Sequence, residues 1–169
     1  MISVNPFSRW SERPRAAGFT LIEMIMTLLL IGILAAFATV RFTGRELDER
    51  GFHDGTLAYL RFAQKKAIVQ RRTVCVSFSA NSISLSMASA AATYDCNVPA
   101  TIRGPRDDTP PTLTAPAGVS YVTPPANFNF DSLGRPIDSS GALVAQQTFQ
   151  VNGLALSMTV EPGAGYVHD

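Results

Sequence analysis

The stretch "GFTLIEMIMTLLLIGILAAFATV", residues 18–40, decides how the chain is organised, because it is a long apolar run that contains one charge. From Phe19 to Val40 it has 22 residues, and Glu23 is the only charged one. As a helix it would be about 33 Å long, enough to cross the hydrocarbon core of a bilayer. Leu, Ile, Met and Ala all tolerate a helix well. The sequence therefore predicts a transmembrane helix over residues 19–40.

Glu23 needs an explanation, since a carboxylate at the centre of a bilayer costs about 2.5–3.5 kcal/mol and less near the interface. Small residues end at Gly18, directly before the run. Cleavage after Gly18 would create an amine on Phe19, four residues from Glu23. That amine, or the same amine of a neighbouring copy, would neutralise the acid. An interfacial glutamate that stays hydrated or protonated is the alternative, and the cost of the charge does not decide between them.

Residues Gly18 to Glu23 resemble the type IV prepilin motif: a Gly, a Phe that becomes N-terminal, and a Glu four residues later, before an apolar run. The resemblance implies that a prepilin peptidase removes residues 1–18 and methylates the Phe19 amine. Glu23 would then pair with the Phe19 amine of an adjacent pilin subunit, while the inner-membrane machinery builds a filament. The 18-residue leader and the lack of proline in the run favour a minor subunit over a major pilin.

Residues 41–72 are predicted to continue this helix as an amphipathic half. Leu57, Leu60, Ala63 and Ala67 recur at helical spacing, whereas charged side chains lie around the rest of the helix. Three glycines, the last of them Gly55, could mark a bend.

After Arg72 the apolar period becomes two, which predicts a C-terminal antiparallel β domain over residues 73–169. The strands 74–78 and 83–87 form a hairpin around residues 79–81. Asn152-Gly153 predicts a second hairpin with a two-residue turn. Shorter strands are expected near residues 128–130 and 165–167. The Pro-rich segment 99–125 is predicted to be mostly an exposed excursion, with one strand near residues 119–122. The fold class is α+β and pilin-like, a long N-terminal helix packed on an antiparallel sheet.

The two cysteines, Cys75 and Cys96, are either free thiols or a disulfide, depending on the compartment that receives the domain. Cys75 is predicted to face away from Val74 and Val76, on the side where it could meet a covering loop, and Cys96 lies in such a loop. If the domain is exported we expect a disulfide, which closes a loop of about 20 residues and is worth roughly 3 kcal/mol.

Three later motifs resemble the GspH/FimT branch of minor pilins and pseudopilins: "AQKKAI" at residues 63–68, "F-x-x-x-G-R-P" at residues 130–136, and the closing residues 165–167. The helix end also resembles minor pilins of MSHA-like systems. The resemblance implies a single-pass inner-membrane protein with a periplasmic C-terminal domain, assembled into a type IV pilus or a type II secretion pseudopilus. The sequence does not distinguish these machines. Three arginines precede the apolar run and three follow it closely, so they give no orientation.

The helix end carries a basic group that could contact DNA phosphates, with two further arginines near it: Lys65, Lys66, Arg71, Arg72, Arg103 and Arg106. The alternative is a solvated helix end whose cations complement the helix dipole. DNA-binding members of the branch carry a Gly-Arg-x-Arg element, but Tyr166 and His168 replace both arginines in this chain. A DNA-binding minor pilin that acts in DNA uptake is therefore a disfavoured alternative.

An enzyme is not expected. The two histidines, His53 and His168, have no ligand-like partner nearby in sequence, and no metalloprotease motif, phosphate loop or nucleophile elbow occurs. Asp107 and Asp108 are interpreted as a solvated acidic pair. No metal or cofactor is predicted. A formal net charge of +1 gives no global field toward nucleic acid or an acidic partner.

Overall fold

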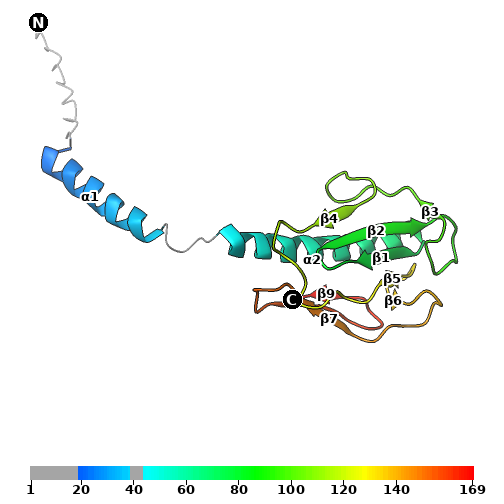
Figure 1. The fold of residues 1–169 in the computed structure, drawn as a ribbon. Helices are drawn as coiled ribbons and strands as arrows, with labels where there is room; N and C mark the ends of the chain where they lie inside the picture. The colour runs from blue at the N-terminus through cyan, green and yellow to red at the C-terminus, as the bar shows by residue number, and fades with distance from the viewer. Residues whose placement is uncertain (1–18, 39–43) are drawn as a thin grey trace, which may run out of the picture. The chain divides into compact units, whose positions relative to one another are not determined.

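The computed structural model describes residues 19–38 and 44–169, which divide into an N-terminal and a C-terminal unit near residue 41 (Figure 1). In the first unit, helix α1 spans Leu21–Ala38. No helix within the described residues is long and apolar enough to cross a membrane. The prediction of one continuous helix depends on residues 39–43, which lie outside the described ranges.

Helix α2, Gly44–Gln70, is the predicted amphipathic helix. Leu57, Leu60, Ala63 and Ala67 are all buried, so the predicted apolar stripe is confirmed. The helix runs through Gly55 without a break. A Cβ at Gly55 would lie only 2.7 Å from Leu113 Cδ2. This glycine therefore leaves room for a strand residue to pack closely against the helix and does not break the helix.

The larger sheet has six strands, with the order β3-β2-β1-β5-β6 and with β4 also paired to β2. Its centre is the predicted hairpin, β1 (Val74–Phe78) and β2 (Ser82–Ala88), in which Val76 pairs with Leu85. The other strands are short: β3 (Pro99–Ala100), β4 (Thr112–Thr114), β5 (Phe128–Phe130) and β6 (Pro136–Ile137).

The smaller sheet contains β7 (Gln147–Gln150), β8 (Ser157–Val160) and β9 (Val167–His168) in that order. The predicted two-residue turn at Asn152-Gly153 is wrong in its register. Gln150 pairs with Ser157, so the connection spans residues 151–156. Val151 instead bridges Tyr121, and the Asn152 amide donates to the Ser120 carbonyl. Contacts with a distant segment thus override the local turn preference.

The Pro-rich segment is less exposed than predicted. Leu113, in the unpredicted strand β4, and Ile102 are both buried. The strand expected at residues 119–122 is reduced to the single bridge at Tyr121.

The core of the C-terminal unit lies where α2 meets strands of both sheets, an α+β arrangement of a helix on antiparallel strands (Figure 1). Aromatic rings fill part of it. The ring centroids of Phe52 and Tyr121 are 4.9 Å apart, and those of Phe78 and Phe149 are 5.4 Å apart. Such pairs add to the stability that burial of their area provides.

Candidate processing and assembly site

The N-terminal motif surrounds the start of α1. Thr20 directly precedes the helix, its Oγ1 accepts a hydrogen bond from the Glu23 amide at 3.3 Å, and its carbonyl accepts one from the Met24 amide. Thr20 is therefore the N-cap residue. Phe19 lies outside the helix and is 76% exposed, whereas Gly18 lies outside the described residues. A chain beginning at Phe19 would keep its helix cap.

Glu23 is the third residue of α1 and is exposed. Thr20 and Glu23 have the spacing of a capping box, in which the third helical residue is Glu or Gln. A carboxylate in the first turn is also favourable toward the helix dipole. This capping-box spacing was not among the predictions, although the Thr-x-x-Glu pattern can be read in the sequence. The Glu23 amide therefore takes part in the helix cap, and the assembly role of the Glu23 carboxylate stays a prediction.

The surface of α1 is apolar and unpartnered in the described part of the chain. The side chains of residues 19–35 are exposed, including Leu21, Leu28 and Ile31. A helix that is apolar on every side is typical of burial in a membrane or among other helices.

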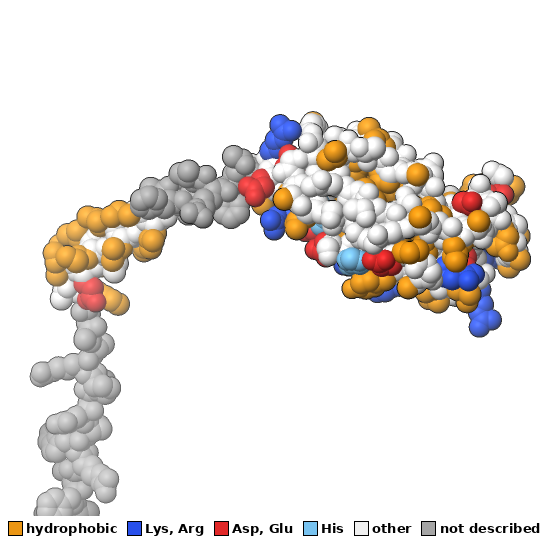
Figure 2. All heavy atoms as spheres, turned by 90° about the horizontal axis from the view of Figure 1, so that it is seen from below, with side chains coloured by type: hydrophobic (Ala, Val, Ile, Leu, Met, Phe, Trp, Pro, Cys, Tyr) orange, Lys and Arg blue, Asp and Glu red, His pale blue; other side chains and the backbone are white. Residues whose placement is uncertain are grey.

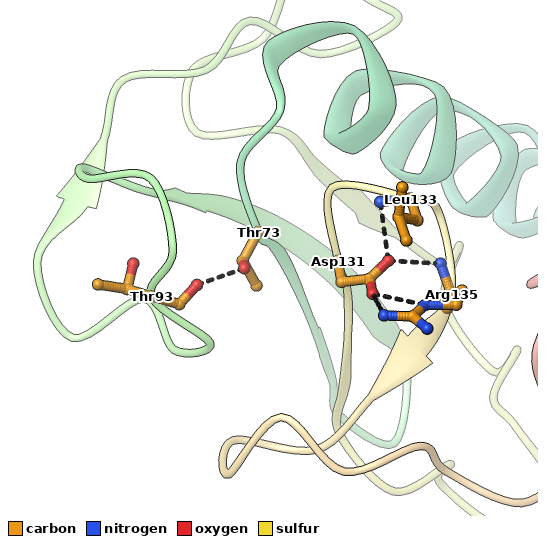
Figure 3. Close-up of polar contacts among 5 residues, drawn as sticks. All are labelled: Thr73, Thr93, Asp131, Leu133 and Arg135. Atoms are coloured by element: carbon orange, nitrogen blue, oxygen red, sulfur yellow. Dashed lines mark hydrogen bonds and ion pairs between the residues drawn. The ribbon is translucent and has the colours of Figure 1, made fainter.

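The cysteines form a disulfide, as expected for an exported domain, between Cys75 of β1 and Cys96. Their Cα atoms are 6.2 Å apart. Two hydrogen bonds hold the same loop, one from Thr73 Oγ1 to the Thr93 carbonyl (Figure 3) and one from Asn129 Nδ2 to the Tyr94 carbonyl. The predicted covering loop is therefore fixed to the strands at several points.

The predicted basic residues do not form one group. Lys65, Lys66, Arg71 and Arg72 lie at or just after the C-terminal end of α2. Arg103 pairs with Asp107 at 2.8 Å, and Arg106 lines a hollow together with Leu47 and Asp48 in the first turns of α2. On the face drawn in Figure 2, Lys and Arg side chains stand at both ends of the domain.

The three later motifs meet at one place, which we call the Gln64 junction: Gln64, the turn 131–135 and the segment 164–167. Gln64 Nε2 donates to the carbonyl of Gly134 at 3.2 Å and to that of Ala164 at 2.9 Å. Gly165 has a φ of +64°, and a Cβ there would collide with the Gly134 carbonyl oxygen. Residues far apart in sequence therefore build one structural unit.

Two ionic or polar contacts stiffen the Gln64 junction. The Asp131 carboxylate accepts hydrogen bonds from the amides of Leu133 and Arg135 and pairs with the Arg135 guanidinium at 2.7 Å (Figure 3). Arg61 Nε donates to the Val167 carbonyl at 3.1 Å. None of these contacts was predicted, because the polar character of Gln64 and Asp131 in the sequence does not identify their partners.

At the chain's C-terminal end, the rings of Tyr166 and His168 stack with centroids 5.1 Å apart. A hydrogen bond to Glu161 raises the pKa of His168. Tyr166 and His168 are the two residues that stand in place of the arginines of the Gly-Arg-x-Arg element considered above.

His53 and Asp108 each have a polar neighbour in the structure. His53 is fully buried with Nδ1 3.0 Å from Asp54, and no group of three or more His, Cys, Asp or Glu side chains able to hold a metal occurs among the described residues.

The interpretation of Asp107 and Asp108 as a solvated acidic pair is wrong for Asp108, because it accepts hydrogen bonds from the Tyr59 hydroxyl and the Thr112 amide, both at 2.7 Å. Burial alone would raise the pKa of Asp108, but these hydrogen bonds outweigh it and lower that pKa. Burial and the hydrogen bond to Asp108 raise the pKa of Tyr59 to about 12.

Comparison with known proteins gives one match. The family described as the prokaryotic N-terminal methylation motif matches residues 13–39. No curated protein and no solved structure matches this chain. The match covers the last six residues of the expected leader, the expected cleavage site and residues 19–39 of the apolar run, and it supports a type IV prepilin-like protein that fits a substrate of a prepilin peptidase.

Proposed function

We propose that the protein is a minor pilin or pseudopilin of the GspH/FimT type. A prepilin peptidase cleaves it between Gly18 and Phe19 and methylates the Phe19 amine. The apolar run 19–40 anchors it in the inner membrane, and the C-terminal domain lies in the periplasm. The single observation that carries the proposal is the match of residues 13–39 to the methylation motif, with Thr20 placed so that cleavage leaves α1 capped.

Two further observations support this proposal. The disulfide between Cys75 and Cys96 suits an oxidising compartment such as the periplasm. The exposed apolar side chains of α1 need either lipid or other helices around them. In a subunit of a type IV pilus or type II secretion machine, lipid would surround this helix in the membrane. Other helices would surround it after the subunit moves into the filament.

Replacing Gly18 tests the processing step. We expect Gly18→Leu to abolish cleavage, because the bulky side chain would stand next to the scissile bond. Intact-mass analysis of the protein from native membranes should find wild-type chains that begin with a methylated Phe19 and variant chains that keep the leader. Gly32→Leu, within the same run, is the control and should be processed normally. A wild-type protein that retains Met1 contradicts the proposal.

A DNA-binding minor pilin is the second candidate, favoured only by the four cations at the end of α2. The separation of Arg106 from them and the Tyr166–His168 pair argue against it. A gel-shift assay with the full chain in detergent distinguishes the two. Salt-sensitive micromolar binding that is lost when Lys65, Lys66, Arg71 and Arg72 become alanine would favour DNA binding. Absence of a shift favours a purely structural subunit.

A further inference from the structure

The Asn152-Gly153 pair lies on an exposed turn that the proposed function does not use. The Leu154 amide donates to the Val151 carbonyl at 3.2 Å, so the pair occupies the two central positions of a four-residue turn. Gly153 has a φ of +94°, which is typical of the third residue of a type II turn. Both central residues are exposed, so water reaches the Asn152 side chain and the peptide bond after it.

An asparagine followed by a glycine is open to an intramolecular reaction. The backbone nitrogen of the second residue can attack Cγ of the asparagine side chain. A side chain on that second residue hinders the approach, and glycine has none. A hydrogen bond donated by the attacking nitrogen also opposes the reaction, because that bond has to break first.

Neither reacting group of this pair is held in place. Among residues 44–169, the Gly153 amide donates no hydrogen bond, and the Asn152 side chain makes none. The backbone on either side is anchored, because the Asn152 amide donates to the Ser120 carbonyl at 2.8 Å and Val151 bridges Tyr121. The fold therefore fixes the turn and leaves the reacting groups free.

The other asparagines in the described part of the chain do not meet both conditions. The residue that follows them is Ser, Val or Phe in every case: Asn81, Asn97, Asn127 and Asn129. Two of these side chains are also held by hydrogen bonds. Asn127 Oδ1 accepts one from the Phe78 amide at 2.8 Å, and Asn129 Nδ2 donates one to the Tyr94 carbonyl. Asn152 is thus distinguished by both its sequence and its structure.

The turn packs on a buried carboxylate of α2. A Cβ at Gly153 would collide with the Glu49 carboxylate, so this side chain lies directly against the turn. Glu49 is 5% exposed, and its carboxylate pairs with Arg45 Nε at 3.0 Å. A new carboxylate at residue 152 would stand one residue from this contact and would repel Glu49.

We propose that Asn152 is a site of spontaneous deamidation, and that the carboxylate it forms loosens the turn 151–154 from α2. The Gly153 nitrogen bonds to Asn152 Cγ, the bond from Cγ to the side-chain nitrogen breaks, and ammonia leaves with the proton of the Gly153 amide. Water then opens the cyclic imide at either ring carbonyl and gives aspartate or isoaspartate. The net change is the uptake of water and the loss of ammonia, with no oxidant or reductant. The reaction is independent of the proposed function.

Mass spectrometry tests the modification in the full chain, kept folded in detergent micelles at neutral pH in heavy-oxygen water. We expect residue 152 to lose ammonia, to take up heavy oxygen and to appear as both aspartate and isoaspartate. Asn152→Gln is the matched control and should stay unmodified, because its longer side chain closes a ring much more slowly. Asp54-Gly55, the corresponding aspartate pair, is an internal control and should not isomerise, because it lies inside α2.

The chain unfolded in urea gives the intrinsic rate of the reaction. The folded chain should react within about tenfold of that rate, the factor that breaking one hydrogen bond would cost. A folded chain that reacts more slowly than this, or a modification at the other asparagines in place of Asn152, overturns the proposal.

Hydrogen exchange tests the effect of the new carboxylate. In Asn152→Asp, the Leu154 amide should exchange about threefold faster than in the wild type, the effect of one unfavourable charge pair near the surface. The same change made in a Glu49→Gln background should have no effect, because the repulsion is absent there. Asn81→Asp, in the β1–β2 turn, is the control and should leave Leu154 unchanged. If Asn152→Asp has no effect, or has the same effect in both backgrounds, the repulsion by Glu49 is refuted.

Discussion

Glu23 has the position of a capping-box residue and a proposed pairing role, and substitution can separate the two. In the described structure it is the third residue of a helix capped by Thr20. Under the proposed function its charge pairs with the Phe19 amine of a neighbouring subunit. The capping role requires only Glu or Gln at this position, whereas the pairing role requires the negative charge.

Two variants of Glu23 follow from this distinction. Both Glu23→Ala and Glu23→Gln should leave cleavage at Gly18 intact and reduce incorporation into filaments about tenfold, the effect of losing about 1.4 kcal/mol. Quantitative immunoblotting of sheared filaments against whole cells measures the effect. Glu46→Ala, at the third position of α2, is the matched control and should assemble normally. If Glu23→Gln assembles at the wild-type level, the pairing argument is wrong and only the helix cap matters.

Among the secondary-structure elements, the sequence predicted those that the spacing of neighbouring apolar residues defines. The buried stripe of α2 and the β1–β2 hairpin both follow from the spacing of apolar residues. Predictions from the sequence were wrong where a distant segment decides the structure. Strand β4 forms because Leu113 packs against Gly55, and the Asn152-Gly153 turn is widened because Val151 pairs with Tyr121.

The same division holds for the candidate site. The cleavage motif is contiguous, so residues Gly18 to Glu23 and the family match agree without any tertiary information. The Gln64 junction joins residues up to about 100 positions apart in sequence, as its hydrogen bond to Ala164 shows. Its three motifs could be noticed in the sequence, but their convergence on one side chain required the structure.

Gln64 should therefore control how firmly the two turns are held on α2. Gln64→Met keeps the size of the side chain but removes both hydrogen bonds, which should lower the free energy of unfolding by about 1–2 kcal/mol. Hydrogen exchange should accelerate at the amides of Gly134 and Gly165 while the β1–β2 hairpin keeps its protection. Gln70→Met, at the exposed last residue of α2, is the control and should change neither measurement. Unchanged exchange in both turns of the Gln64 variant would show that the helix is not held to them through this amide.

At the scale of the whole molecule, the disulfide is expected to contribute a large part of the stability of the C-terminal unit. It joins Cys75 in the central strand to a loop 21 residues away, so breaking it frees that loop in the unfolded chain. The double variant Cys75→Ala with Cys96→Ala should lose about 3 kcal/mol of unfolding free energy, measured by urea unfolding of the full chain in detergent under oxidising conditions. Ser77→Ala, at an exposed position of the same strand, is the control and should change the unfolding free energy by less than about 0.5 kcal/mol.

Because Thr73 and Asn129 also hold this loop, the hydrogen exchange of the loop should rise only in part when the disulfide is absent. If the double variant unfolds at the same urea concentration as the wild type, these polar contacts and the packed sheet suffice and the disulfide is not needed for the fold.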